Sequence, residues 1–92
     1  MANKQSFKTQ LALAQDMVQS LYNRYNEVEY VDGRIKDLLQ MLEEVGMFYE
    51  IIETLGEIYQ NNFFPLKEEL TTGILSDIKY VQEQEEGLES II

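Results

Sequence analysis

Several residue types that carry common chemistry are absent from this chain of 92 residues. It contains no Cys and no His, which excludes disulfides, zinc sites built from these ligands and the usual acid–base and nucleophile arrangements. It has a single Pro and no Trp, and its five Gly are isolated from one another, so there is no Gly-rich phosphate loop. We therefore expect a protein that is not an enzyme and that holds no cofactor and no metal.

Long apolar runs and positive charge are also scarce. No stretch of about 18 apolar residues could span a membrane. The apolar part of MANKQSFKTQLALAQDM is too short and too interrupted for a signal peptide, which predicts a cytoplasmic location. The net charge is −10, and residues 32–64 and 65–92 each carry two bases against seven acids. Because such a surface repels phosphates, we expect no direct binding to nucleic acid or to anionic membranes.

Hydrophobic residues make up 45% of the chain, and their spacing indicates helices. In the first third they recur at alternating steps of four and three, which is typical of a packed amphipathic helix. Ser6 can cap its start, so the predicted helix covers residues 6–29. The apolar positions are Phe7, Leu11, Ala14, Val18, Leu21, Tyr25 and Val28.

The apolar pattern then changes phase. Asp32 is a good N-cap and Gly33 tolerates unusual backbone angles, so we predict a break followed by a second helix over residues 33–61. One unbroken helix over residues 6–60 is the alternative. The new apolar positions are Val31, Ile35, Leu38, Leu42, Val45, Tyr49, Ile52 and Tyr59.

A third helix is predicted over residues 65–88. Asn61 and Asn62 favour a helix end, and Pro65 fits the first turn of the next helix. Its apolar side consists of Leu66, Leu70, Ile74, Ile78, Val81, Leu88 and Ile92. The expected fold class is all-α: one domain, residues 1–92, of two or three amphipathic helices in a small antiparallel bundle or hairpin. Because so small a chain has no disulfide or metal to stabilise it, we expect dimerisation to complete the bundle.

Carboxylates are the one remaining chemical resource. Glu50 and Glu53 form an E-x-x-E pair of the kind that holds Mg²⁺ between helices in helical nucleotide pyrophosphatases. The third helix offers no matching pair except Glu83 and Glu86, which lie in an end that we expect to fray. We therefore interpret these acids as a solvent-exposed helix face.

Binding to another protein is the function that these patterns favour. The segment MFYEII (residues 47–52) is apolar around more of the helix than one seam requires, which predicts burial on a second side. Phe63 and Phe64 are interpreted as a staple between two helices or as an exposed anchor for a partner. We predict a non-catalytic helical interaction module, a small accessory or adaptor protein that is a homodimer or a subunit of a larger assembly. The predicted contact residues are Met47, Phe48, Ile51, Phe63 and Phe64.

An acidic inhibitor that imitates nucleic acid, such as a phage-encoded antagonist, is the alternative function. Rows of acids would occupy the basic groove of a DNA- or RNA-binding enzyme, and such binding weakens steeply with salt. The acids predicted to form this surface are Glu43, Glu50, Glu57, Glu68, Glu69 and Glu83.

Overall fold

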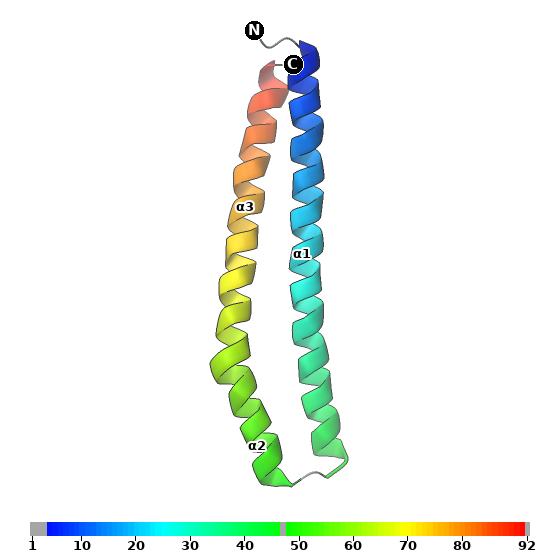
Figure 1. Ribbon diagram of the computed structural model, residues 1–92, viewed down its shortest axis with the longest axis vertical. Helices are drawn as coiled ribbons and strands as arrows, with labels where there is room; N and C mark the ends of the chain where they lie inside the picture. The colour runs from blue at the N-terminus through cyan, green and yellow to red at the C-terminus, as the bar shows by residue number, and fades with distance from the viewer. Residues whose placement is uncertain (1–3, 47, 92) are drawn as a thin grey trace. The chain divides into compact units, whose positions relative to one another are not determined.

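The computed structural model describes residues 4–46 and 48–91, and these residues contain helices and no strand. The elements are α1 (Lys4–Glu44), α2 (Tyr49–Ile58), the π-helix η1 (Tyr59–Phe63) and α3 (Phe64–Ile91) (Figure 1). No residue separates α2, η1 and α3, so the backbone is helical from Tyr49 to Ile91. The predicted all-α fold class is confirmed.

Two compact units make up the chain. The terminal unit combines the residues up to Tyr25 with those from Gly73 onward, and the central unit covers Asn26–Thr72. In each unit the residues with the least exposure form a seam, which is the line along which two helical segments pack.

The seam of the terminal unit follows the predicted spacing. The α1 residues that the spacing singled out are half-buried, namely Phe7, Leu11, Ala14, Val18, Leu21 and Tyr25. From α3, Ile74, Ile78 and Val81 are buried and Leu88 is half-buried, while Ile92 lies outside the described residues. The predicted apolar stripe at the start of the chain is therefore confirmed.

Helix α1 does not break near Asp32, so the predicted helix end at residue 29 is wrong. Steps of four and three continue along α1 through residues that are all at least half-buried: Val28, Asp32, Ile35, Leu39 and Leu42. Asp32 itself is 3% exposed. The change of phase read from the sequence arose because only apolar residues were followed, and the seam position at 32 holds a carboxylate.

Gly46 ends α1 instead, so the predicted helix over residues 33–61 and the unbroken helix over residues 6–60 are both wrong. Gly46 has a φ of 75°, a left-handed conformation that favours glycine after a helix. Its N–H donates to the Glu43 carbonyl at 3.2 Å, and the Val45 N–H donates to the Met41 carbonyl at 3.0 Å. Helix α2 then starts where the Phe48 carbonyl accepts hydrogen bonds from the N–H groups of Ile51 and Ile52, at 3.0 and 3.2 Å.

The predicted helix end at Asn61 and Asn62 is also wrong, because the chain passes through them as η1. A π-turn holds one residue more than an α-turn and therefore rotates the helix that follows. The seam runs through Ile52, Gly56, Tyr59 and Phe63 and then, at steps of four, to Lys67 and Thr71 before it reaches Ile74. Leu66 and Leu70, which were predicted to be on the packed side, are 66% and 53% exposed.

Candidate functional site

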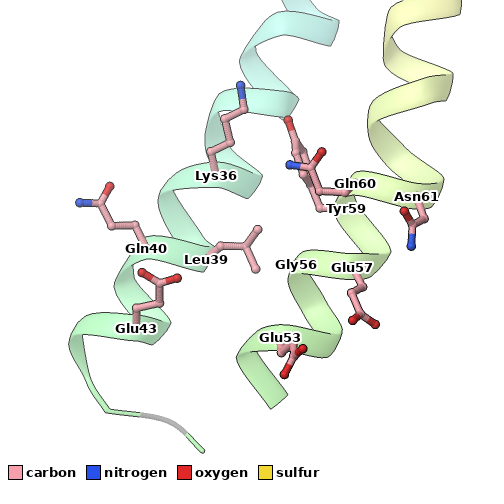
Figure 2. A pocket seen from close by; sticks show the side chains of 10 residues that line it. All are labelled: Lys36, Leu39, Gln40, Glu43, Glu53, Gly56, Glu57, Tyr59, Gln60 and Asn61. Atoms are coloured by element: carbon pink, nitrogen blue, oxygen red, sulfur yellow. The ribbon is translucent and has the colours of Figure 1, made fainter. Parts of the chain in front are cut away.

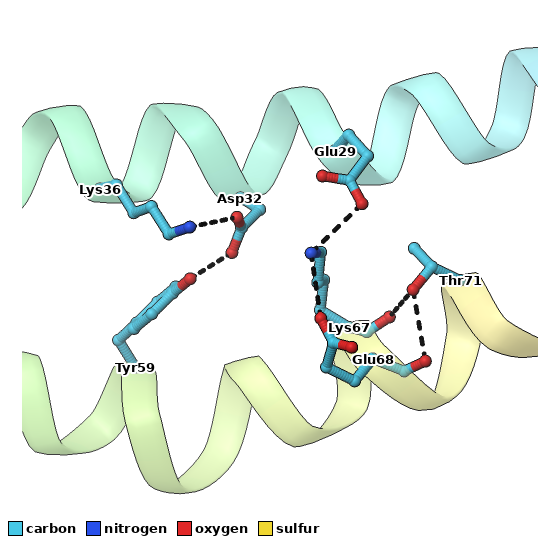
Figure 3. Close-up of polar contacts among 7 residues, drawn as sticks. All are labelled: Glu29, Asp32, Lys36, Tyr59, Lys67, Glu68 and Thr71. Atoms are coloured by element: carbon cyan, nitrogen blue, oxygen red, sulfur yellow. Dashed lines mark hydrogen bonds and ion pairs between the residues drawn. The ribbon is translucent and has the colours of Figure 1, made fainter.

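The seam of the central unit contains a polar cluster among its apolar positions (Figure 3). Asp32 of α1 accepts a hydrogen bond from the Tyr59 hydroxyl, and its second oxygen lies 3.1 Å from the Lys36 ammonium nitrogen. Asp32 and Tyr59 are both buried, at 3% and 5% exposure. A buried carboxylate is costly unless it is paired and hydrogen-bonded, and here each oxygen has its own partner.

The surroundings of Asp32 and Tyr59 shift the pKa values of both residues. Burial is the largest single effect on Asp32 and raises its pKa. The hydrogen bonds from Tyr59 and Lys36, with the charges of Lys36 and Lys67, outweigh burial and leave the pKa of Asp32 below its usual value. For Tyr59, burial and the hydrogen bond to the Asp32 carboxylate raise the pKa of the phenol. Tyr59 is therefore a neutral donor and Asp32 a charged acceptor at neutral pH.

A second polar contact lies further along the same seam. The Lys67 ammonium nitrogen is 3.2 Å from a Glu29 carboxylate oxygen of α1 and 3.2 Å from Glu68, and it lies 5.8 Å from the centre of the Phe64 ring. Hydrogen bonds to Glu29 and Glu68 raise the pKa of Lys67. The buried Thr71 hydroxyl donates a hydrogen bond to the Lys67 carbonyl at 2.9 Å, so this polar group has its partner within α3.

These contacts fix how α1 lies against the returning helical run. Asp32 meets Tyr59 while the earlier Glu29 meets the later Lys67, so the two segments of the central unit run antiparallel. Polar groups that need a specific partner across a seam discriminate between alternative registers of packed helices. The contacts of Asp32 with Tyr59 and of Glu29 with Lys67 therefore favour the register in which the two segments pack.

One flank of this seam is polar. The residues that directly follow seam positions line an open groove of about 570 Å³, together with parts of the seam itself (Figure 2). We call this flank the polar face; it consists of Lys36, Gln40, Glu43, Glu53, Glu57 and Gln60.

The other flank is apolar. Seven apolar residues that directly precede seam positions are between 42% and 66% exposed. We call them the apolar face: Val31, Leu38, Met41, Ile51, Ile58, Leu66 and Leu70. Part of this face forms a groove of about 370 Å³ lined by Glu27, Val28, Val31, Phe63, Leu66, Lys67 and Leu70.

The predicted contact residues lie in different places. Met47 is outside the described residues. Phe48 is 81% exposed beside the turn, and Ile51 belongs to the apolar face. Phe63 lines the apolar groove, and its ring stacks on the Tyr59 ring with 5.7 Å between the two centroids. The Phe64 ring also packs against Tyr59, in a tilted arrangement with 6.2 Å between the centroids. Phe63 and Phe64 are in a continuous helix and not at the corner that the sequence suggested.

The acids predicted for a nucleic-acid mimic are also dispersed. Glu43, Glu53 and Glu57 line the groove of the polar face, and Glu68 pairs with Lys67. Glu50 lies near the turn, Glu69 is exposed on α3, and Glu83 belongs to the terminal unit. Within the ranges 4–46 and 48–91, no group of three or more acids is placed to hold a metal ion.

No family model, curated protein or solved structure matches this chain. Among the described helices, none has the length and apolar character that crossing a membrane requires.

Proposed function

We propose that this chain is a non-catalytic helical interaction module whose central unit binds another protein through its apolar face. The observation that carries the proposal is the contrast between the two flanks of one seam. Residues that precede the seam positions are mostly apolar and exposed, while those that follow them are mostly charged or amide-bearing. Exposed apolar residues gathered on one side of a helix pair are typical of an interaction surface.

The polar seam strengthens this interpretation. Asp32, Lys67 and Thr71 occupy positions that would otherwise bury apolar side chains, while Leu66 and Leu70 remain outside. A pair of helices with this distribution gains little apolar burial by itself, so association supplies what it lacks. We therefore propose that the antiparallel pair of the central unit is completed as a small bundle by further helices.

The proposed contacts include four residues from the sequence prediction. Ile51 and Phe63 lie on or beside the apolar face, and Phe48 is exposed at the turn that leads into it. Met47 stays in the proposal on sequence grounds. Phe64 follows a seam position, on the flank opposite the apolar face, and so is a staple for Tyr59 in this proposal.

Affinity capture from the native host, with mass spectrometry of the recovered proteins, tests this function. The bait carrying Leu66→Glu and Leu70→Glu should lose the partner that the wild type recovers. A matched bait carrying Glu53→Lys and Glu57→Lys on the polar face should retain it. Recovery of the same proteins with the wild-type and apolar-face baits would contradict the proposal, and circular dichroism of each bait establishes that it is folded.

An acidic mimic of nucleic acid is the second candidate function. The observation in its favour is that Glu43, Glu53 and Glu57 line one groove of the polar face. The same baits test it with the opposite expected result. The Glu53→Lys and Glu57→Lys bait would lose the partner of a mimic, the Leu66→Glu and Leu70→Glu bait would retain it, and raised salt would release it.

A further inference from the structure

The apolar face carries very little charge for so acidic a protein. The central unit contains eleven acids and three bases. Among the residues that precede its seam positions, the charged ones are Glu27 and Arg34, both exposed and of opposite sign. The charges on the residues that precede the seam positions therefore cancel, and the other acids of the central unit occupy other helix positions.

Glu27 and Arg34 are placed almost symmetrically about Val31. Glu27 comes four residues before Val31 and Arg34 three residues after it, so all three lie on one side of α1. Val31 itself is 47% exposed and lines the apolar groove with Leu66 and Leu70. If two copies of α1 cross antiparallel near Val31, each Glu27 comes beside the Arg34 of the other copy.

We infer that the apolar groove binds α1 of a second copy of this chain, antiparallel, with the two-fold axis near Val31. The inference rests on the proposed function, because it names the partner of the same face. A two-fold contact must be self-complementary, and the two Glu27–Arg34 pairs provide that complementarity. Each Val31 enters the groove that Val31, Leu66 and Leu70 of the other copy line.

Charge also argues for a second copy over a differently charged partner. A basic protein would be attracted to the polar face, where Glu43, Glu53 and Glu57 lie, and not to a neutral groove. Two chains of net charge −10 can associate only where their acids are out of the contact, since repulsion between closely apposed like charges is costly. The apolar face meets this condition.

Complementary charge reversal tests the inference. The variants Glu27→Arg and Arg34→Glu should each dimerise about tenfold or more weakly than the wild type, because each turns both pairs from attractive to repulsive. An equimolar mixture of the two variants should form heterodimers, which native mass spectrometry separates by mass. The double variant carrying both reversals should dimerise with itself. Light scattering at micromolar concentration gives the mass of each species.

Rescue in trans is the decisive readout. A contact that Glu27 makes within its own chain cannot produce a heterodimer when two defective variants are mixed. Glu57→Arg, on the polar face, is the matched control and should dimerise like the wild type, and circular dichroism establishes that each variant is helical. A monomeric wild type, or dimers unaffected by either single reversal, would overturn the inference. Neither result would contradict the proposed function, which is tested separately by the capture experiment with the Leu66→Glu and Leu70→Glu bait.

Discussion

The hydroxyl of Tyr59 donates a hydrogen bond to the carboxylate of Asp32, 27 positions away in the chain and across the seam of the central unit. The two residues occupy seam positions of η1 and α1 where two apolar side chains would ordinarily meet. This one contact holds the π-helix against α1 and places the two flanks of the seam, one polar and one apolar.

Removal of the Tyr59 hydroxyl should destabilise the protein. In Tyr59→Phe the buried Asp32 carboxylate loses a donor and keeps only Lys36, which should cost about 1–3 kcal/mol of unfolding free energy. Denaturant unfolding followed by circular dichroism measures this loss. Tyr30→Phe is the control, since Tyr30 is 68% exposed and its change should be within about 0.5 kcal/mol. Equal stabilities of the two variants would show that the hydrogen bond contributes nothing.

Stability should depend on the charge of Asp32 at acid pH. The pKa of Asp32 is lower in the folded protein than its usual value, so the stability that the charged carboxylate contributes is present above the usual value and is lost as the pH falls through the folded pKa. The variant Asp32→Asn should therefore be less stable than the wild type at pH 7, and the difference should shrink below about pH 4. Unfolding curves of both proteins between pH 7 and pH 3 measure this. A difference that stays constant over that range would contradict the lowered pKa.

Two glycines should respond to alanine with opposite signs. Gly46 has a φ of 75°, which strains any side chain, so Gly46→Ala should destabilise the protein by about 1 kcal/mol. Gly56 is inside α2, and a Cβ there meets nothing within 4 Å, so Gly56→Ala should stabilise by roughly 0.5–1 kcal/mol. Thermal unfolding of the pair measures both effects. Stabilisation by Gly46→Ala would show that Gly46 does not need its left-handed conformation, and destabilisation by Gly56→Ala would contradict the expected gain in helix propensity.

Replacement of Glu85 in the terminal unit should stabilise the protein. Its Oε1 atom is buried and, among the described residues, has no hydrogen-bond partner, although Glu85 lies between Val81 and Leu88 on the seam side of α3. Replacement of Glu85 by Leu should raise the unfolding free energy by about 1–2 kcal/mol, because an unpaired buried oxygen gives way to apolar packing. Glu86→Leu, at an exposed position, is the matched control and should show no such gain. A lower melting temperature for Glu85→Leu would contradict this account of the seam.

The sequence could predict the terminal part of α1 and the buried side of α3 because there the seam is apolar. Phe7 to Tyr25 and Ile74 to Val81 follow helical spacing without exception, so hydrophobic periodicity alone identifies their packed sides.

The central unit could not be predicted in the same way because polar residues occupy its seam. Asp32 looked like a helix start, although continued steps of four and three from Val28 would have placed it in the seam. Gly46 looked like an interior glycine, and only its left-handed conformation identifies the turn. The pairing of Asp32 with Tyr59 and of Glu29 with Lys67 depends on how the chain folds back, which spacing along one helix does not encode.

The π-helix decides which side of α3 faces α1, because it absorbs one extra residue. A mutation that removed one codon within residues 59–63 would make the turn α-helical and leave the residues after it facing as they do now, whereas five α-helical residues in the same place would rotate everything after them by about 100°. Leu66 and Leu70 would then turn toward α1, while Ile74, Ile78 and Val81 would lose their packed positions in α3. The side chains that this protein hides and those that it displays are thus decided by a single inserted amino acid.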